Sequence, residues 1–256
     1  MREEFNPIAQ KGLKTFRNSL SAGLLALLSD SAIAEDDDKS LAFTGEVGLA
    51  SMFIDRGEQL GAATLTAALG AEKEISGVVL YGGVSLINPV GDDREPFDEE
   101  VDYTIGAAWD GPGYSADVSA NWLTYPGEAS EESLEIAGSL TFDQALSPTL
   151  ATFYDAEFED WGLEFTAGPE WLVSDWTLYT LGRLGFVEPG DGSQNRTYAG
   201  VEAGASRPLF GNTEFGVFSR YEWANQDSFA DDISNGVITS VTDSGFAVGI
   251  ALTSSY

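Results

Sequence analysis

The sequence has 256 residues, no cysteine, no histidine and a formal net charge of −30. The length suits one domain, and without cysteine neither disulfides nor thiolate metal sites are available. A negative charge of this size argues against nucleic acid as a partner, because phosphates need cationic contacts. Without histidine a Ser-His-acid site cannot be built, so we expect no enzyme and no cofactor. The acidic runs at 92–93, 98–100 and 231–232 match no calcium-loop spacing, so no metal site is predicted.

The N-terminal 34 residues have the pattern of a secretory signal peptide. Three basic residues precede a short apolar core at 20–28, and Ala32 and Ala34 occupy the positions that signal peptidase reads. We expect cleavage after Ala34, with residues 1–34 removed and residues 35–256 exported as one domain. An uncleaved amphipathic helix is the alternative.

Beyond Ala34 the dominant pattern has a period of two residues, which is typical of strands with two different faces. On the segment 101–110, for example, Tyr103, Ile105 and Trp109 alternate with Asp102 and Thr104. The pattern predicts about twelve strands, with ten or fourteen as alternatives, because one segment is apolar on both faces and one gap is very short. The predicted strands are 42–54, 63–74, 77–87, 101–110, 113–124, 133–142, 149–158, 161–172, 176–187, 197–205, 213–223 and 244–256.

Two features favour a membrane barrel over a soluble sandwich, and the last strand, described below, is a third. The apolar faces often begin and end in aromatic residues, and about ten tilted residues rise roughly 25 Å, the height of an outer-membrane apolar band. Long gaps such as 88–100, 188–196 and 224–243 alternate with short ones such as 75–76 and 111–112. In lipid an open sheet edge is not viable. We therefore predict an all-β fold, a transmembrane antiparallel up-and-down β-barrel in the outer membrane of a Gram-negative cell.

The last predicted strand indicates how the barrel is assembled. Its bulky face ends in an aromatic residue, which is common in outer-membrane barrels and is recognised by the barrel-assembly machinery. The residues of this assembly signal are Phe246, Val248, Ile250, Leu252 and Tyr256. The expected partners are this machinery, outer-membrane lipid and lipopolysaccharide.

The segment 46–57 resembles the N-terminal strand of the TorF-like porin family, which carries a Ser-x-aromatic-x-x-Arg-Gly pattern. Ser51, Phe53, Arg56 and Gly57 match it. The Tyr125-Pro126-Gly127 step followed by Glu131-Glu132 is also similar to that family. The similar layout covers roughly residues 43–256. The resemblance implies an outer-membrane porin and names no particular substrate.

If the apolar faces meet lipid, the opposite faces line a lumen rich in carboxylates. Rings of Asp and Glu attract cations, so we predict a water-filled, cation-preferring pore for passive diffusion of small polar or cationic solutes. The predicted lining residues are Glu46, Arg56, Glu72, Glu74, Asp102, Asp117, Asn121, Glu135, Asp155, Glu157, Glu164, Arg183, Glu202, Glu214, Arg220 and Glu222.

Two alternatives stay open for this lumen. Its carboxylates can be hydrated filler without a selective role, or the barrel can be narrow or plugged and act through its acidic outer loops without conducting. Of the three lining arginines, Arg183 and Arg220 are expected to pair with carboxylates, and Arg56 is expected to anchor the first loop. Inward Phe153, Tyr179 and Phe218 can narrow the passage or form an apolar lining for a flat solute.

Overall fold

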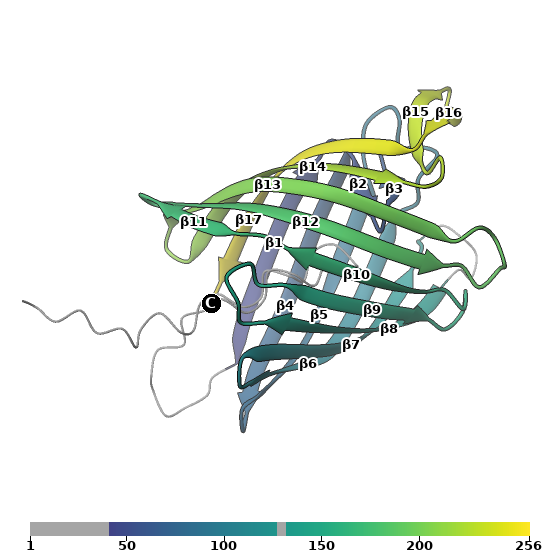
Figure 1. Cartoon of the computed structure of the whole chain (residues 1–256). Helices are drawn as coiled ribbons and strands as arrows, with labels where there is room; N and C mark the ends of the chain where they lie inside the picture. The colour runs from purple at the N-terminus through teal and green to yellow at the C-terminus, as the bar shows by residue number, and fades with distance from the viewer. Residues whose placement is uncertain (1–40, 127–131) are drawn as a thin grey trace, which may run out of the picture.

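The computed structural model describes residues 41–126 and 132–256. Twelve of its strands form the wall of a closed antiparallel barrel (Figure 1). In chain order the wall strands are β1 (Ala42–Ala50), β4 (Thr64–Ile75), β5 (Val78–Pro89), β6 (Glu100–Gly111), β7 (Tyr114–Thr124), β8 (Glu132–Phe142), β9 (Thr149–Asp155), β10 (Trp161–Ala167), β12 (Trp176–Glu188), β13 (Arg196–Phe210), β14 (Thr213–Ala224) and β17 (Ser244–Ser255). The predicted all-β fold and strand number are confirmed. The predicted signal peptide, Gly127 and Glu131 lie outside the described residues.

Each wall strand pairs with the wall strands before and after it in the chain, and one further pairing, between the first and the last strand, closes the ring. β1 pairs with β17 from Thr44↔Ser255 to Ala50↔Gly249. β10 pairs with β12 from Trp161↔Glu188 to Ala167↔Gly182, and the short β11 (Glu170–Val173) adds to β12 beyond the end of β10. The wall therefore has no unpaired edge, which is the condition for a sheet in hydrocarbon.

Side chains alternate across the wall as the period-two pattern predicts. On β6, Ile105 is 69% exposed and Tyr103 is 50% exposed, whereas Asp102 and Thr104 between them are 2% and 5% exposed. The same bulky outer face continues on β17. Its predicted assembly residues Phe246, Val248, Ile250, Leu252 and Tyr256 are between 46% and 80% exposed. Large apolar side chains thus cover the outside, and polar ones point inward.

The two ends of the barrel differ. At the turn end the connections are short, as at residues 76–77 and 112–113, while the loop end carries connections such as 90–99 and 225–243. The connection 225–243 forms a hairpin of β15 (Phe229–Ser234) and β16 (Val237–Thr242), which projects beyond the wall (Figure 1). The predicted alternation of short and long gaps is therefore present. No helix in the described ranges is long and apolar enough to cross a membrane.

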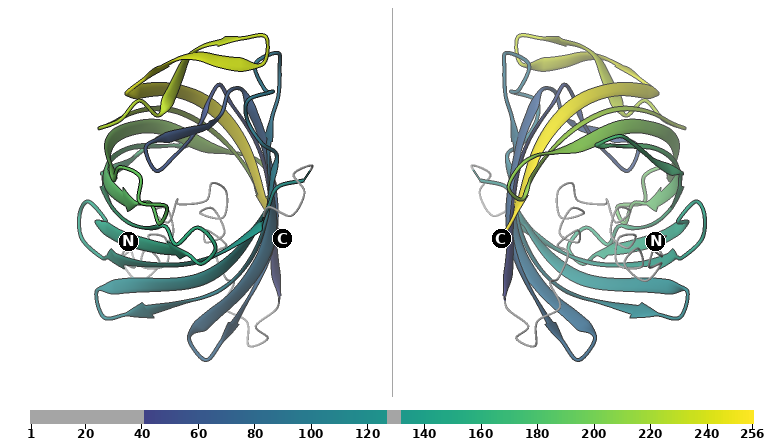
Figure 2. Two further views of the ribbon diagram at one scale, coloured as in Figure 1. Left: turned by 90° about the vertical axis from the view of Figure 1, so that its right-hand side faces the viewer. Right: turned by 90° about the vertical axis from the view of Figure 1, so that its left-hand side faces the viewer.

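Four predicted strand ends are wrong by three residues or more. The strand predicted at 161–172 ends at Ala167, with the separate β11 after it, and the strand predicted at 197–205 continues to Phe210. The first strand ends at Ala50 instead of residue 54, and the chain then turns into a separate hairpin of β2 (Phe53–Asp55) and β3 (Glu58–Gly61). Figure 2 looks along the barrel and shows this hairpin inside the ring of wall strands. The strand predicted at 149–158 ends at Asp155, because the Asp155 carboxylate accepts the backbone N–H groups of Glu157 and Phe158 in a turn. We call residues 53–61 the lumen hairpin.

The apolar core of the molecule lies between the lumen hairpin and the wall. Phe229, at the start of β15, has no exposed surface and closes this cluster from the loop end. Its buried members are Ile54, Phe153, Val187, Tyr198, Ala224, Phe229 and Ala247.

Candidate functional site: the lumen hairpin and its ionic contacts

The lumen hairpin exists because of its two-residue turn. Arg56 and Gly57 both have positive φ, 49° and 75°, which matches the twist of a tight antiparallel hairpin. A side chain at Gly57 would also collide with the ring of Tyr198, so this position needs glycine for both backbone and space. Ser51, at the entrance to the hairpin, exchanges hydrogen bonds with Val248 of β17: the Ser51 N–H donates at 2.8 Å and its hydroxyl accepts at 3.0 Å.

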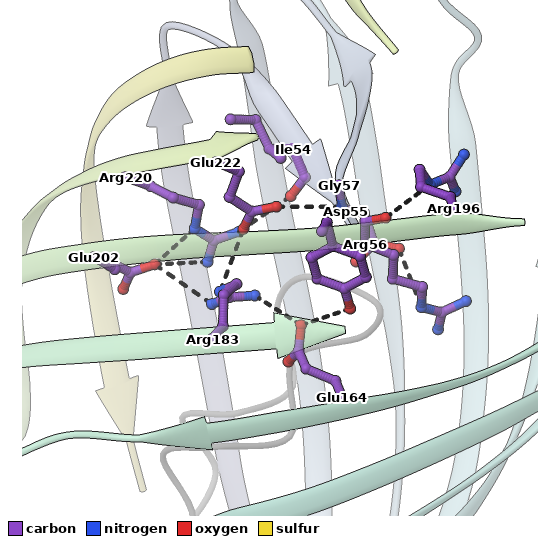
Figure 3. Close-up of polar contacts among 11 residues, drawn as sticks. Ile54, Asp55, Arg56, Gly57, Glu164, Arg183, Arg196, Glu202, Arg220 and Glu222 are labelled. Carbon is purple, nitrogen blue, oxygen red and sulfur yellow. Dashed lines mark hydrogen bonds and ion pairs between the residues drawn. The ribbon is translucent and has the colours of Figure 1, made fainter. Parts of the chain in front are cut away.

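One side of the lumen hairpin is bonded to β14. The backbone N–H of Gly57 donates to Oε2 of Glu222 at 3.2 Å, and Nη1 of Arg220 donates to the carbonyl of Ile54 at 3.1 Å (Figure 3). Both wall residues are themselves part of a buried ionic network. The hairpin backbone is therefore attached to groups that the wall already holds in place.

The connection between β14 and β15 holds the same side. The backbone N–H of Gln59 donates to the carbonyl of Ser228 at 3.0 Å, and the Ser228 hydroxyl donates to the carbonyl of Gly57 at 2.6 Å. The N–H of Ala230 donates to Oε1 of Gln59 at 3.0 Å. Hydrogen bonds thus join the lumen hairpin to the start of the outer hairpin β15–β16.

Arg56 is held from two sides of the lumen. Its carbonyl accepts a hydrogen bond from Nε of Arg196 on β13 at 2.9 Å. Its guanidinium reaches β8 and forms an ion pair with Glu135 at 2.6 Å, and it lies 3.5 Å from the centroid of the Phe153 ring on β9. Arg196 also forms an ion pair with Glu58 at 2.7 Å. The sequence predicted an anchoring role for Arg56, and the structure gives it contacts across the lumen.

The charge on Arg56 is fixed by its surroundings. Burial alone would lower the pKa of this guanidinium, but the carboxylates of Asp55 and Glu135 outweigh burial and raise that pKa above its ordinary value. Arg56 therefore stays a cation at any pH at which the barrel is folded.

A second set of ion pairs ties β10, β12, β13 and β14 together. The Arg183 guanidinium lies 3.3 Å from Glu164, 3.3 Å from Glu222 and 3.8 Å from Glu202. Arg220 forms a further ion pair with Glu202 at 2.7 Å (Figure 3). The side chains of Arg183 and Glu222 are 1% and 0% exposed. Both arginines hold wall strands together, which is the role that the sequence predicted for them.

The opposite wall carries a ladder of polar contacts between neighbouring strands. The Ser85 hydroxyl donates to Asp102 at 3.1 Å, and the Thr104 hydroxyl donates to Asn121 at 2.8 Å. Nδ2 of Asn121 then donates to Glu135 at 3.3 Å. These contacts link side chains of β5 to β8 to one another.

The field along this wall is negative. Tyr125 lies directly after β7, and burial together with the carboxylates of Glu100 and Asp102 raises the pKa of its phenol. Asp55, on the lumen hairpin, lies 3.5 Å from the Arg56 guanidinium, and Glu135 of β8 lies 2.6 Å from it. Arg56 is therefore the cation between a carboxylate of the hairpin and a carboxylate of the wall.

The structure divides the predicted lining residues by depth. Those of the loop half are packed and buried: Asp102, Asn121, Glu135, Asp155, Glu164, Arg183, Glu202 and Glu222. Arg220 is partly buried beside the lumen hairpin. The others on the inner face are also only partly buried: Glu46, Glu72, Glu74, Asp117 and Glu214. Glu157 does not line the lumen, because it is exposed in the connection after β9. The lumen hairpin fills the loop half, and accessible carboxylates lie nearer the turn end.

Several residues of this site were not predicted. Arg196 and Ser228 fall at or within sequence gaps that read as outer connections, and Gln59 follows a strand end placed too late. Tyr198, whose hydroxyl donates to Glu164 at 2.8 Å, looks in the sequence like any other strand aromatic. Their roles depend on the inward fold of residues 51–63, which has no local sequence signal.

Comparison with known proteins places the fold but not a family. No protein-family model matches the sequence, and no curated protein does. The crystal structure of an outer membrane channel from Pseudomonas putida F1 is similar, with a TM-score of 0.54 and 6% identity over 88% of this chain and 100% of that one. A structure described as KdgM porin gives a TM-score of 0.47 and 9% identity over 84% of this chain and 99% of that one. At 6% identity the likeness to the Pseudomonas putida channel is one of fold. The resemblance to the TorF-like porin family stays a prediction.

Proposed function

We propose that this chain is an outer-membrane channel through which small polar solutes diffuse passively, with a preference for cations. Export through a cleaved signal peptide and insertion by the barrel-assembly machinery belong to the same proposal. The outer face would contact outer-membrane lipid and lipopolysaccharide. The large apolar side chains exposed on the outside of the wall support insertion into a lipid bilayer, because few soluble monomers expose a continuous apolar surface of this extent.

The observation that carries the proposal is the distribution of charge on the inner face. The arginines Arg56 and Arg183 are used in buried ion pairs in the loop half. The more accessible half of the inner face presents the carboxylates Glu46, Glu72 and Asp117. A lumen lined in this way between low-dielectric walls raises the local concentration of cations and lowers that of anions.

The packing of the loop half favours a second candidate, a barrel that is plugged and does not conduct. Thr64 and Glu222 have no exposed surface there, and Asp102 is 2% exposed. Under this alternative the acidic outer loops would carry the function. Conduction separates the two candidates directly.

The test is the reversal potential of the purified protein in planar bilayers under a KCl gradient. We expect channel steps and a cation-signed potential. The double variant Glu72→Gln/Asp117→Asn should move that potential toward zero, since both carboxylates lie on the inner face. Asp191→Asn, in the exposed connection 189–195, is the matched control and should leave it unchanged. A zero or anion-signed potential contradicts the cation preference, and an absence of channel steps supports the plugged barrel.

A further inference from the structure

We infer that the ion pair between Arg56 and Glu135 is a latch that sets the aperture of the channel by holding the lumen hairpin across the lumen. The inference rests on the proposed channel function and deepens it, because it names the residues that limit the size of the solute. It follows from the unequal attachment of the hairpin on its two sides.

The side toward β13 and β14 is attached through the hairpin backbone. The Gly57 N–H and the Ile54 carbonyl bond to Glu222 and Arg220, and the backbone of Gln59 bonds to Ser228. Such bonds are short and leave little freedom to the segment that they hold. This side of the hairpin is therefore the fixed one.

The side toward β6 to β9 is attached through a long side chain. The Arg56 guanidinium reaches Glu135 at 2.6 Å and covers the Phe153 ring at 3.5 Å. The polar groups of the wall here bond to one another, as Asn121 does to Glu135 and Thr104 does to Asn121. An arginine stem has several rotatable bonds, so this attachment can break without unfolding the hairpin.

Arg56 lies between two carboxylates on the latched side. Asp55 of the hairpin is 3.5 Å from its guanidinium, and Glu135 of β8 is 2.6 Å from it. The Arg56 cation offsets the repulsion between these two carboxylates and holds the hairpin against β8. Without that cation the two carboxylates repel each other, and the hairpin moves toward β13 and β14, where it is bonded. The passage then widens along the β6–β8 wall, beside Glu100 and Asp102.

The test compares single-channel conductance and the size limit for sugars in liposome swelling across a set of variants. Arg56→Gln and Glu135→Gln each break the latch with little change in volume. We expect conductance to rise about twofold or more, since conductance follows the width of the aqueous path. The exchange Arg56→Glu/Glu135→Arg restores an ion pair of reversed polarity and should return conductance toward that of the parent protein. Arg207→Gln is the matched control, because Arg207 pairs with Asp175 near the turn end, away from the hairpin.

The outcomes separate the latch from the channel. If the parent protein conducts, and both single variants have the conductance and the size limit of the parent protein, the latch is overturned and the channel function stands. If neither the parent protein nor any latch variant conducts, the channel function fails together with the latch. Folding is judged by heat-modifiable mobility in gel electrophoresis. If a single variant does not fold, the exchange variant decides. Restored folding with the conductance of the parent protein supports the latch, and a different conductance overturns it.

Discussion

Replacing Arg183 by alanine should destabilise the barrel strongly, because its guanidinium is buried among carboxylates on the inner face of the wall. Its guanidinium is 1% exposed and lies 3.3 Å from both Glu164 and Glu222. Removing it leaves Glu164 with the hydroxyl of Tyr198 and leaves Glu222 without its nearest cation. Breaking a buried pair by deleting one partner typically costs about 3–5 kcal/mol, because a buried charge is left uncompensated. We expect Arg183→Ala to lower the free energy of unfolding by about that amount.

The measurement is reversible urea unfolding of the refolded protein in lipid bilayers, followed by tryptophan fluorescence. Arg207→Ala serves as the comparison, since its partner Asp175 is half exposed and an exposed ion pair contributes about 0–1 kcal/mol. Similar, small losses of stability in the two variants would contradict a buried charge left uncompensated by the loss of Arg183. That result would mean that water or mobile cations reach the carboxylates around Arg183.

Three further substitutions test other contacts of the wall. Ile105→Lys places a charge in the middle of the lipid-facing side of β6 and should cost about 2–4 kcal/mol in the same unfolding assay; a neutral effect would mean that this face is not in hydrocarbon. Tyr198→Phe removes the hydrogen bond to Glu164 and should cost about 1.5–3 kcal/mol, as for other hydrogen bonds to charged groups; equal unfolding midpoints would contradict the bond. Gly204→Val displaces the ring of Tyr179, which lies against that glycine from the lumen side, and should cost about 1–3 kcal/mol by overpacking; an unchanged midpoint would argue against the packed ring.

The wall could be predicted from the sequence because its information is local. Alternation on segments such as 101–110 identifies the strand and the side of the wall on which each residue lies. The length of a gap shows at which end of the barrel that connection lies. Twelve strands, their approximate limits and the outward position of Ile105 and Val248 follow from this pattern and are confirmed. Alternation does not give the depth of a residue along the barrel. Glu157 was therefore placed in the lumen although the strand ends at Asp155.

The lumen hairpin could not be predicted because its contacts are remote in sequence. Arg196 bonds to Arg56 across 140 positions, and Glu222 bonds to Gly57 across 165 positions. The motif around Arg56 and Gly57 marked this segment as unusual, but it did not show that the segment folds inward. The same limit applies to the charges. The net charge can be counted from the sequence, whereas the ion pairs of Arg183 and Arg220 depend on which strands become neighbours.

The outer face of the wall meets lipid and the inner face meets water. Because the chain has no cysteine, single cysteines at positions 248 to 253 of β17 can each carry a spin label in proteoliposomes. The measurement is the accessibility of each label to oxygen and to a water-soluble nickel complex, from electron paramagnetic resonance. We predict that labels at 248, 250 and 252 are accessible to oxygen, and that labels at 251 and 253 are accessible to the nickel complex. Nickel accessibility at 248, 250 and 252 with oxygen accessibility at 251 and 253 would contradict a lipid-embedded barrel with an aqueous interior. The same accessibility at all five positions would contradict it as well.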